Sequence, residues 1–517
     1  MTHLTRVLTP PRAPVFLATM SGGQVTFSGD LGCSLGHKLA RTEGAQGVFA
    51  EWSWNGQRLT AVNDRYGFHP LFVYHKGNHI GVSPSIATLV LHGADTELDC
   101  PALAVALRLG QFIGEDTPFR HIRALPPNAT LQWDGRELRV SGGFEFRPAI
   151  PAPNRKEAVQ TYVELFRRSI ERRLPSAQNF AVPLSGGRDS RHILFELMRN
   201  GLRPAFCLTV MQYPDDVRVA GLLCKNLGLQ HVVVGQPNAP FTAEIKKNWL
   251  TNFGVDEGVW QLAISDSLIE RGITTIYDGI GGDLLSAGLF LERPLDSLFR
   301  TEQPRKVAEQ LLSPDEEALL ERVLARAFLS ECSREAALER LAIEIARHKA
   351  AHNPVTSFYF WNRTRRKIAL VPYGMLSMIP KVFSPYLDHD LFDFLASLPA
   401  EFLMDHSFHT ETIVKGFPQW AHIPFEDKKA KDYDFSSMHA RFARDYARFG
   451  LFSRPPTLLR TGSLYSRLVL SLTRQSFGAS QYWYLRRAAW VQQLEEVIRA
   501  GKNTGQFAGA SAHRAAA

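Results

Sequence analysis

Cysteines are few in this sequence, and long apolar runs are lacking. The five cysteines among 517 residues form no Cys-x-x-Cys pair, which argues against a disulfide framework and a zinc site and favours a reducing cytoplasm. No apolar stretch approaches the roughly 18 residues that a bilayer-spanning helix needs, so we expect no membrane segment. Prolines at positions 10, 11 and 14 interrupt the N-terminal segment, and we expect no export signal there.

Charge of one sign is never gathered into a long tract. The net charge is +8, but the basic residues are spread through expected helices, whereas nucleic-acid-binding proteins usually carry a basic patch or stripe. We therefore expect no nucleic-acid partner and interpret the basic residues as a solvated surface or as attraction for ATP and pyrophosphate. With 45% hydrophobic and 21% charged residues the composition is typical of a globular protein, and the length predicts two domains.

The most informative motif is the segment 179–194, NFAVPLSGGRDSRHIL. An apolar run of β character leads into a glycine-rich turn and then into helical spacing, so we expect a strand, a tight turn and a helix. Two adjacent glycines let backbone amides approach an anion, and the helix N-terminus adds partial positive charge. The alternative is a turn that only caps the helix. The expected phosphate-binding residues are Leu184, Ser185, Gly186, Gly187, Asp189 and Ser190.

Ser-Gly-Gly-x-Asp-Ser after a strand resembles the pyrophosphate-binding loop of ATP pyrophosphatases, which split ATP between the α and β phosphates. The spacing differs from G-x-x-x-x-G-K-[ST], and the lysine of that motif is missing. A kinase acting on the γ-phosphate is therefore disfavoured.

Strands alternate with helices after this loop. Apolar runs at 204–210 and 231–234 flank a helical pattern that ends near Gly228, and such alternation predicts an α/β fold with a parallel sheet and crossover helices. Ligands of these sheets bind at the carboxyl ends of the strands. Thr209 and Val210 are therefore candidates for lining an adenine pocket, with plain core packing as the alternative.

A second strand, near 274–277, runs into the turn Asp-Gly-Ile-Gly-Gly-Asp at 278–283. The turn resembles the Ser-Gly-x-Gly-x-Asp-Glu segment of asparagine synthetases, which implies nucleotide contacts at Gly279, Gly281 and Gly282. Two carboxylates at neighbouring strand ends can share Mg²⁺ with phosphate oxygens, so we expect Asp189 and Asp283 to be metal ligands.

The second turn also departs from the family. Leu284 stands where the family has glutamate, and Ile280 stands where asparagine synthetases carry glutamate and β-lactam synthetases a catalytic tyrosine. An isoleucine cannot move a proton, so neither the asparagine synthetase mechanism nor the β-lactam synthetase mechanism can be assigned to this chain in full.

Residues 1–146 form the first expected domain. Its short strands and turns include three segments that resemble the glutaminase domain of asparagine synthetases, which implies a layered fold of the N-terminal-nucleophile type. The family's N-terminal cysteine is missing: position 2 is Thr2, which we interpret as an exposed tail residue, and Cys33 is expected to be a small buried hydrophobe. We therefore expect glutaminase activity to be lost. The segments are 47–52, 63–71 and 114–127.

The remaining boundaries follow from composition. We expect a proline-rich linker at 147–154, a synthetase domain of the ATP-pyrophosphatase type at 155–500 with a helical addition at 290–355, and a disordered tail at 501–517. Residues 384–399 resemble the family's R-x-P-F-L-D-H segment, but Lys381 and Phe383 replace its upstream glutamate and arginine. We expect Asp388 to position a helix.

Two lysines are the catalytic candidates. Lys429 and Lys431 fall where the family carries an arginine-x-lysine pair near the phosphates, and a cation there would stabilise charge on an acyl-adenylate and pyrophosphate. A solvated charge run is the alternative.

The resemblance implies a cytoplasmic, ATP- and Mg²⁺-dependent ligase. A small-molecule or peptide carboxylate would be adenylated and then attacked by ammonia or by a substrate amine. Four versions stay open: a general amide ligase, a glutamine-hydrolysing asparagine synthetase, a lactam or macrolactam cyclase, and a catalytically silent nucleotide-binding protein. A homodimer is also left open.

Overall fold

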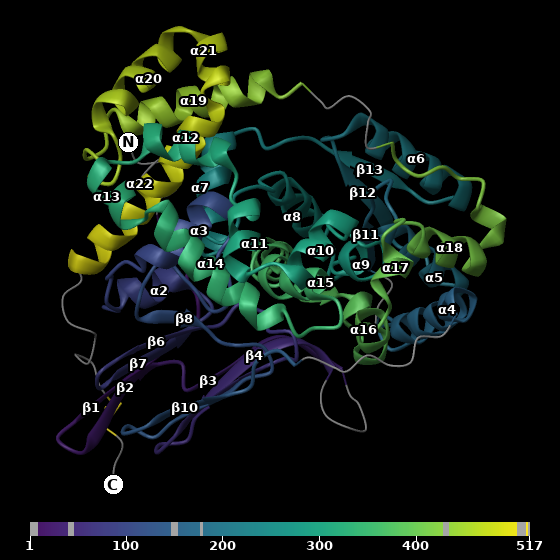
Figure 1. Ribbon diagram of the computed structural model, residues 1–517, viewed down its shortest axis with the longest axis horizontal. Coiled ribbons are helices and arrows are strands. Elements are labelled where there is room, and N and C mark those ends of the chain that lie inside the picture. The colour runs from purple at the N-terminus through teal and green to yellow at the C-terminus, as the bar shows by residue number, and fades with distance from the viewer. Residues whose placement is uncertain are drawn as a thin grey trace.

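The computed structural model describes residues 9–39, 46–145, 154–175, 179–427, 434–503 and 513–514. Antiparallel strands form the N-terminal part, and a parallel sheet with many helices forms the rest, as Figure 1 shows. All five cysteines are free, as expected.

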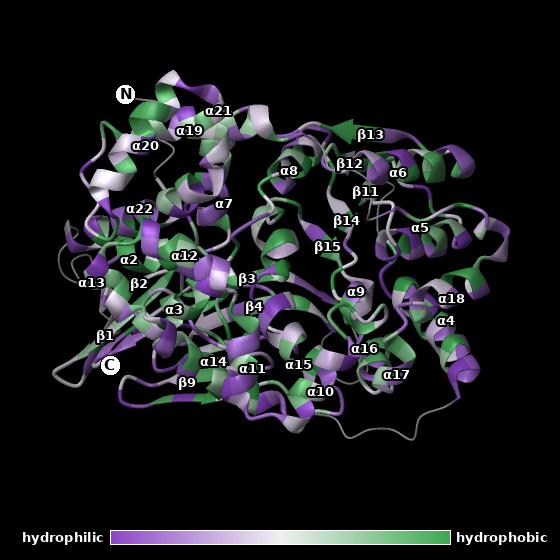
Figure 2. Cartoon of the chain, turned by 45° about the horizontal axis from the view of Figure 1, so that its top comes forward, coloured by the Kyte–Doolittle hydropathy of each residue, from purple (hydrophilic) through white to green (hydrophobic). Residues whose placement is uncertain are grey.

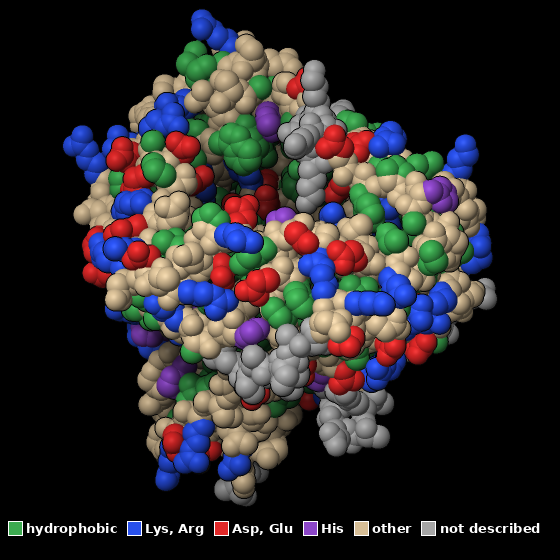
Figure 3. Space-filling view, turned by 45° about the vertical axis from the view of Figure 1, so that its right-hand side comes forward, with side chains coloured by type: hydrophobic (Ala, Val, Ile, Leu, Met, Phe, Trp, Pro, Cys, Tyr) green, Lys and Arg blue, Asp and Glu red, His purple; other side chains and the backbone are tan. Residues whose placement is uncertain are grey.

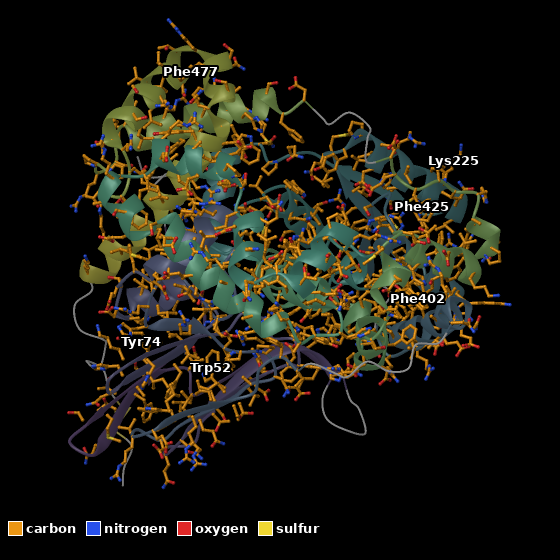
Figure 4. The ribbon with its side chains drawn as sticks, in the orientation of Figure 1. Trp52, Tyr74, Lys225, Phe402, Phe425 and Phe477 are labelled. Carbon is orange, nitrogen blue, oxygen red and sulfur yellow. The ribbon has the colours of Figure 1, made fainter. Side chains whose placement is uncertain are left out.

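Two antiparallel sheets face each other in the N-terminal part. The first has the order β16 (His513–Arg514), β2 (Gln24–Gly29), β1 (Phe16–Ser21), β7 (His79–Ser83), β6 (Phe72–Lys76) and β8 (Ile122–Ala124). The second has the order β10 (Leu138–Ser141), β9 (Thr130–Trp133), β5 (Leu59–Asn63), β4 (Gln46–Trp54) and β3 (Gly32–Leu39). Apolar residues from both sheets, among them Trp52 (labelled in Figure 4), form one buried core.

The parallel sheet confirms the predicted α/β arrangement. Its strands are β13 (His231–Val234), β12 (Phe206–Val210), β11 (Phe180–Pro183), β14 (Thr275–Tyr277) and β15 (Lys381–Phe383), in that spatial order. All neighbouring pairs are parallel. Because β11 and β14 are neighbours, the loops that follow them leave the sheet side by side at its carboxyl edge.

Helices cover both faces of this sheet. Figure 1 shows α5 (Asp189–Arg199) and α6 (Pro214–Leu227) on one side of the strands and α8 (Gln261–Glu270) on the other. The helix before β11 is α4 (Arg155–Glu171), which begins with a capping box between Asn154 and Glu157. Figure 2 shows hydrophobic and hydrophilic residues side by side along these helices, as expected where one face of each helix meets the core.

Further helices complete the C-terminal part. The predicted helical addition contains α10 (Arg293–Thr301), α11 (Pro304–Leu311), α12 (Pro314–Val323), α13 (Arg326–Glu331) and α14 (Arg334–His348). A terminal group contains α19 (Ser436–Gly450), α20 (Thr461–Thr473), α21 (Gln475–Ser480) and α22 (Tyr482–Asn503). The expected tail boundary at 501 needs correction, because α22 runs to Asn503 and residues 513–514 pair with β2.

The surface carries mixed charge. On the face shown in Figure 3, acidic and basic side chains are interspersed over most of the molecule. Within the described ranges, no helix combines the length and the apolar character needed to cross a membrane.

Asp388 joins several elements at the boundary between the two parts. It is the N-cap of α16 (His389–Ala396), where its side chain accepts a hydrogen bond from the Asp390 amide. Its carboxylate also accepts bonds from Arg172 Nη1 at 2.8 Å and from Arg173 Nη1 at 2.9 Å. Arg173 in turn donates to Gln46 Oε1 on β4. Asp388 therefore has the structural role that the sequence predicted.

We expect Asp388→Ala to destabilise the protein strongly. Asp388 and Arg173 are 1% and 2% exposed, and removal of one partner of a buried ion pair costs roughly 3–5 kcal/mol. Asp390→Ala is the matched control, since Asp390 is a more exposed partner of Arg172 and such pairs contribute about 1 kcal/mol or less. Urea unfolding of both variants measures the difference; equal losses would contradict the assignment.

Candidate nucleotide and metal site

The loops after β11 and β14 are in direct contact. A Cβ atom added to Gly279 would lie 2.6 Å from Asp189 Cβ, and one added to Gly282 would lie 2.7 Å from Asp189 Cγ. Any side chain at either position would overlap the first residue of α5. Gly281, between them, has a φ of +89°, which glycine adopts without strain. The structure thus brings Asp189 together with the predicted second loop.

The amides of the first loop already have oxygen acceptors. Ser185 N donates to Ser190 Oγ at 3.1 Å, and Gly187 N donates to Ser185 Oγ at 3.2 Å. Gly186 N donates to the carboxylate of Asp216 on α6. A carboxylate on a loop amide at the start of a helix shows that this position accepts an anionic oxygen, as a phosphate site requires. Sequence reasoning gave Asp216 no role.

The chain at 423–427 is tied to the first loop. Arg191, almost fully buried, donates from Nη2 to Gly186 O at 3.1 Å and to Pro424 O at 2.6 Å. Its guanidinium lies 3.9 Å from the ring centroid of Phe425, which Figure 4 labels. Glu426 N donates to Gly186 O at 3.1 Å. The residues immediately before the predicted catalytic lysines therefore lie against the first loop.

A third carboxylate accompanies the two predicted metal ligands. Burial and the nearby charges of Asp189 and Asp283 raise the pKa of Asp278 to about 6, although its carboxylate accepts a bond from Ile280 N at 2.8 Å. Sequence reasoning quoted Asp278 without assigning a role; its place at the end of β14 was the available signal. Neighbouring carboxylates repel one another, and oxygen donors of this kind fit Mg²⁺.

Three of the expected nucleotide-contact residues lie in the core. Leu184, Thr209 and Val210 are buried. Thr209 Oγ1 donates to Leu184 O at 2.7 Å and lies 2.9 Å from His231 Nε2. The hydroxyl thus links β12 to the end of β11, and nucleotide contact by these residues stays a prediction.

The departures from the family are buried apolar residues. Ile280 and Leu284 are 5% and 1% exposed, so both pack in the core. Phe383, also buried, packs its ring edge-on against His37 at 5.1 Å between centroids. Cys33 is partly buried on β3, and burial raises the pKa of its thiol. Thr2, Lys429 and Lys431 lie outside the described residues.

We expect Gly282→Ala to impair nucleotide binding, because the new Cβ displaces the Asp189 carboxylate. Gly462→Ala in α20 is the control, since nothing lies within 4 Å of its added Cβ and alanine favours a helix. Calorimetric titration with Mg²⁺ and an ATP analogue should show a loss for the first variant alone. Wild-type affinity in Gly282→Ala would refute the close contact.

Asp278→Asn should stabilise the metal-free protein at pH 7. The folded pKa of about 6 exceeds the ordinary value of 3.8, so the ionised carboxyl costs up to roughly 3 kcal/mol at neutral pH. This cost in folding free energy begins above pH 4 and is complete above pH 6. Asp278→Asn does not have the cost, because its side-chain amide does not ionise. The melting temperature of the variant should therefore exceed that of the wild type at pH 7 but not at pH 4. Mg²⁺ should raise the wild-type value more than that of the variant.

Two protein-family models match parts of this chain. The model of the family described as asparagine synthase matches residues 161–412, and that of the glutamine amidotransferase domain matches residues 32–142. No curated protein matches the chain. Among solved structures, the chain is similar to NMN synthetase from Francisella tularensis at 15% identity and a TM-score of 0.17, over 27% of this chain and 59% of that chain. The chain is therefore similar to asparagine synthase over residues 161–412 and to glutamine amidotransferase domains over residues 32–142.

Proposed function

We propose that this protein uses ATP and Mg²⁺ to activate a carboxylate as an acyl-adenylate and then joins it to an amine. The observation that carries the proposal is the contact between the two glycine-rich loops at the ends of β11 and β14. That contact gathers backbone amides, a helix N-terminus and carboxylates at one edge of the sheet, the combination that a metal-bound polyphosphate requires.

The proposed reaction has two steps. An oxygen of the substrate carboxylate attacks the α-phosphorus of ATP, and the bond from that phosphorus to the bridging oxygen breaks, so pyrophosphate leaves. The amine nitrogen then attacks the acyl carbon, AMP leaves with its electron pair, and the amine loses a proton. The proton acceptor is not Ile280, which carries no ionisable group.

Each loop has a separate proposed task. The amides of Ser185, Gly186 and Gly187 and the N-terminus of α5 would hold pyrophosphate oxygens, and at Gly186 the carboxylate of Asp216 occupies that position at present. Asp189, Asp278 and Asp283 would hold Mg²⁺. The bound ion would neutralise charge that builds on the phosphates.

Lys429 and Lys431 are proposed as the cations that stabilise the transition state. Supporting this, Glu426 N donates to Gly186 O at 3.1 Å, and Asp427 N donates to Asp215 Oδ2 at 2.7 Å. The lysines follow Asp427 by two and four residues in the sequence.

The amine is proposed to come from ammonia or from a substrate, because the N-terminal part lacks the family's cysteine nucleophile. Ile280 disfavours the β-lactam mechanism, whereas a peptide or macrolactam product stays open. A second candidate is nucleotide binding without turnover. It is favoured by the buried apolar residues Ile280, Leu284 and Phe383 at positions where the family has polar groups.

Carboxylate-dependent exchange of labelled pyrophosphate into ATP tests the ligase proposal. We expect exchange in the wild type and a loss of roughly 100-fold or more in Asp189→Asn and Asp283→Asn, since each removes charge stabilisation from the transition state. Asp445→Asn, on the exposed side of α19, is the matched control. Lys429→Ala and Lys431→Ala test the two lysines separately. Substitution of the catalytic lysine should lower kcat by a larger factor than it raises KM.

The same assay separates the two candidates. Nucleotide binding without exchange over a broad panel of amino acids and peptides would support the silent protein. Exchange that survives Asp189→Asn would contradict the magnesium assignment.

A further inference from the structure

His409 lies behind the two loops and contacts both. It belongs to α18 (Phe408–Gly416) and its side chain is fully buried. Its Nδ1 atom lies 3.0 Å from Ser286 Oγ and 3.3 Å from Asp189 Oδ1. Ser286 directly follows α9 (Gly282–Leu285), the short helix that carries Asp283. Nδ1 of His409, on a segment distant in sequence from both loops, thus faces the first loop and the short helix α9 of the second loop.

The hydrogen-bond network assigns the proton on this nitrogen. Ser286 Oγ donates its hydrogen to Gly282 O at 2.7 Å, so it presents a lone pair to His409. The carboxylate of Asp189 can only accept. Both partners therefore require a hydrogen on Nδ1 of His409, which donates to them together.

The other ring nitrogen is held equally firmly. Nε2 of His409 lies 3.2 Å from both the Tyr386 hydroxyl and Nδ1 of His192. Nε2 of His192 has no hydrogen-bond partner, which fits a His192 tautomer that donates from Nδ1. His192 stacks on Phe166 at 3.8 Å between centroids. The ring of His409 in turn contacts the rings of Tyr162, His192 and Tyr386, at 5.6, 5.4 and 5.8 Å between centroids, and these contacts restrict its orientation.

We propose that His409 is a positioning residue that holds Asp189 and the Asp283 helix at the separation that a shared metal ion and the pyrophosphate require. The inference rests on the proposed function. Its physical basis is that a buried donor shared by two groups fixes them relative to each other, and that partners of metal ligands govern ligand orientation and metal affinity. A shift of about 1 Å in such a site can cost 100-fold in rate.

A second contact of α18 supports this role. Arg188, inside the phosphate loop, donates from Nε to Thr410 Oγ1 at 2.6 Å. Neighbouring residues of one helix thus hold the start of α5 from two sides. His409 alone reaches Ser286 as well, so it is the residue through which α18 couples the two loops.

Substitution by the two amides tests the proposal. In His409→Asn the amide nitrogen can take the place of Nδ1, whereas in His409→Gln it takes the place of Nε2. Calorimetry with Mg²⁺ and a non-hydrolysable ATP analogue should show Mg²⁺ affinity lowered at least about 10-fold in His409→Gln and largely retained in His409→Asn. Urea unfolding shows whether the two variants are equally stable, as the comparison requires.

A double-mutant cycle with Ser286→Ala gives an independent measurement. If His409 acts through the bridge, the losses in Mg²⁺ affinity from His409→Gln and Ser286→Ala are not additive. Additive losses, or unchanged Mg²⁺ affinity in His409→Gln, overturn the positioning role. Failure of the wild type itself to bind the analogue with Mg²⁺ would instead overturn the proposed function, and with it this inference.

Discussion

The close approach of Asp189 to Gly279 and Gly282 is the constraint on which the site depends. Strands β11 and β14 are neighbours, so their following loops start only about 4.8 Å apart. Two ordinary side chains do not fit between loops that converge from such a start. Glycine on one loop leaves the space for a carboxylate on the other, and the same geometry brings the charges of Asp189 and Asp283 close enough to raise the pKa of Asp278.

The N-terminal part has a second use that does not depend on glutamine chemistry. Its residues contact the C-terminal part: Gly114 N donates to Asn362 Oδ1 at 2.7 Å, and Arg65 pairs with Asp393 in α16. His37 packs against Phe383 on β15, the edge strand of the parallel sheet. Burying these contacts stabilises the sheet that carries both loops, so the N-terminal part supports the site through its packing.

Sequence predicted the parts of the fold that are encoded locally. The strand before Ser185 and the strand before Asp278 were visible because each apolar run ends abruptly at glycine, and their order in the chain implied a parallel sheet. The tertiary contacts around the first loop were not visible in the sequence. Asp216 bonds a residue 30 positions away, and Arg191 bonds the distant segment that contains Ile423 and Pro424. His409 carries no local motif at all, and only tertiary packing places it beside Asp189.

The positions at which this sequence differs from the asparagine synthetase pattern are relevant to the choice of substrate. Residues that face the proposed pyrophosphate and cation, Ser185 and the three aspartates, are polar and clustered. The polar family residues at positions 280, 284 and 383 are replaced by side chains that the core absorbs. In the proposed reaction the first group serves any carboxylate, whereas the second lies where substrate and acceptor contacts are expected. Change confined to the second group is what divergence in substrate, with adenylation retained, would produce.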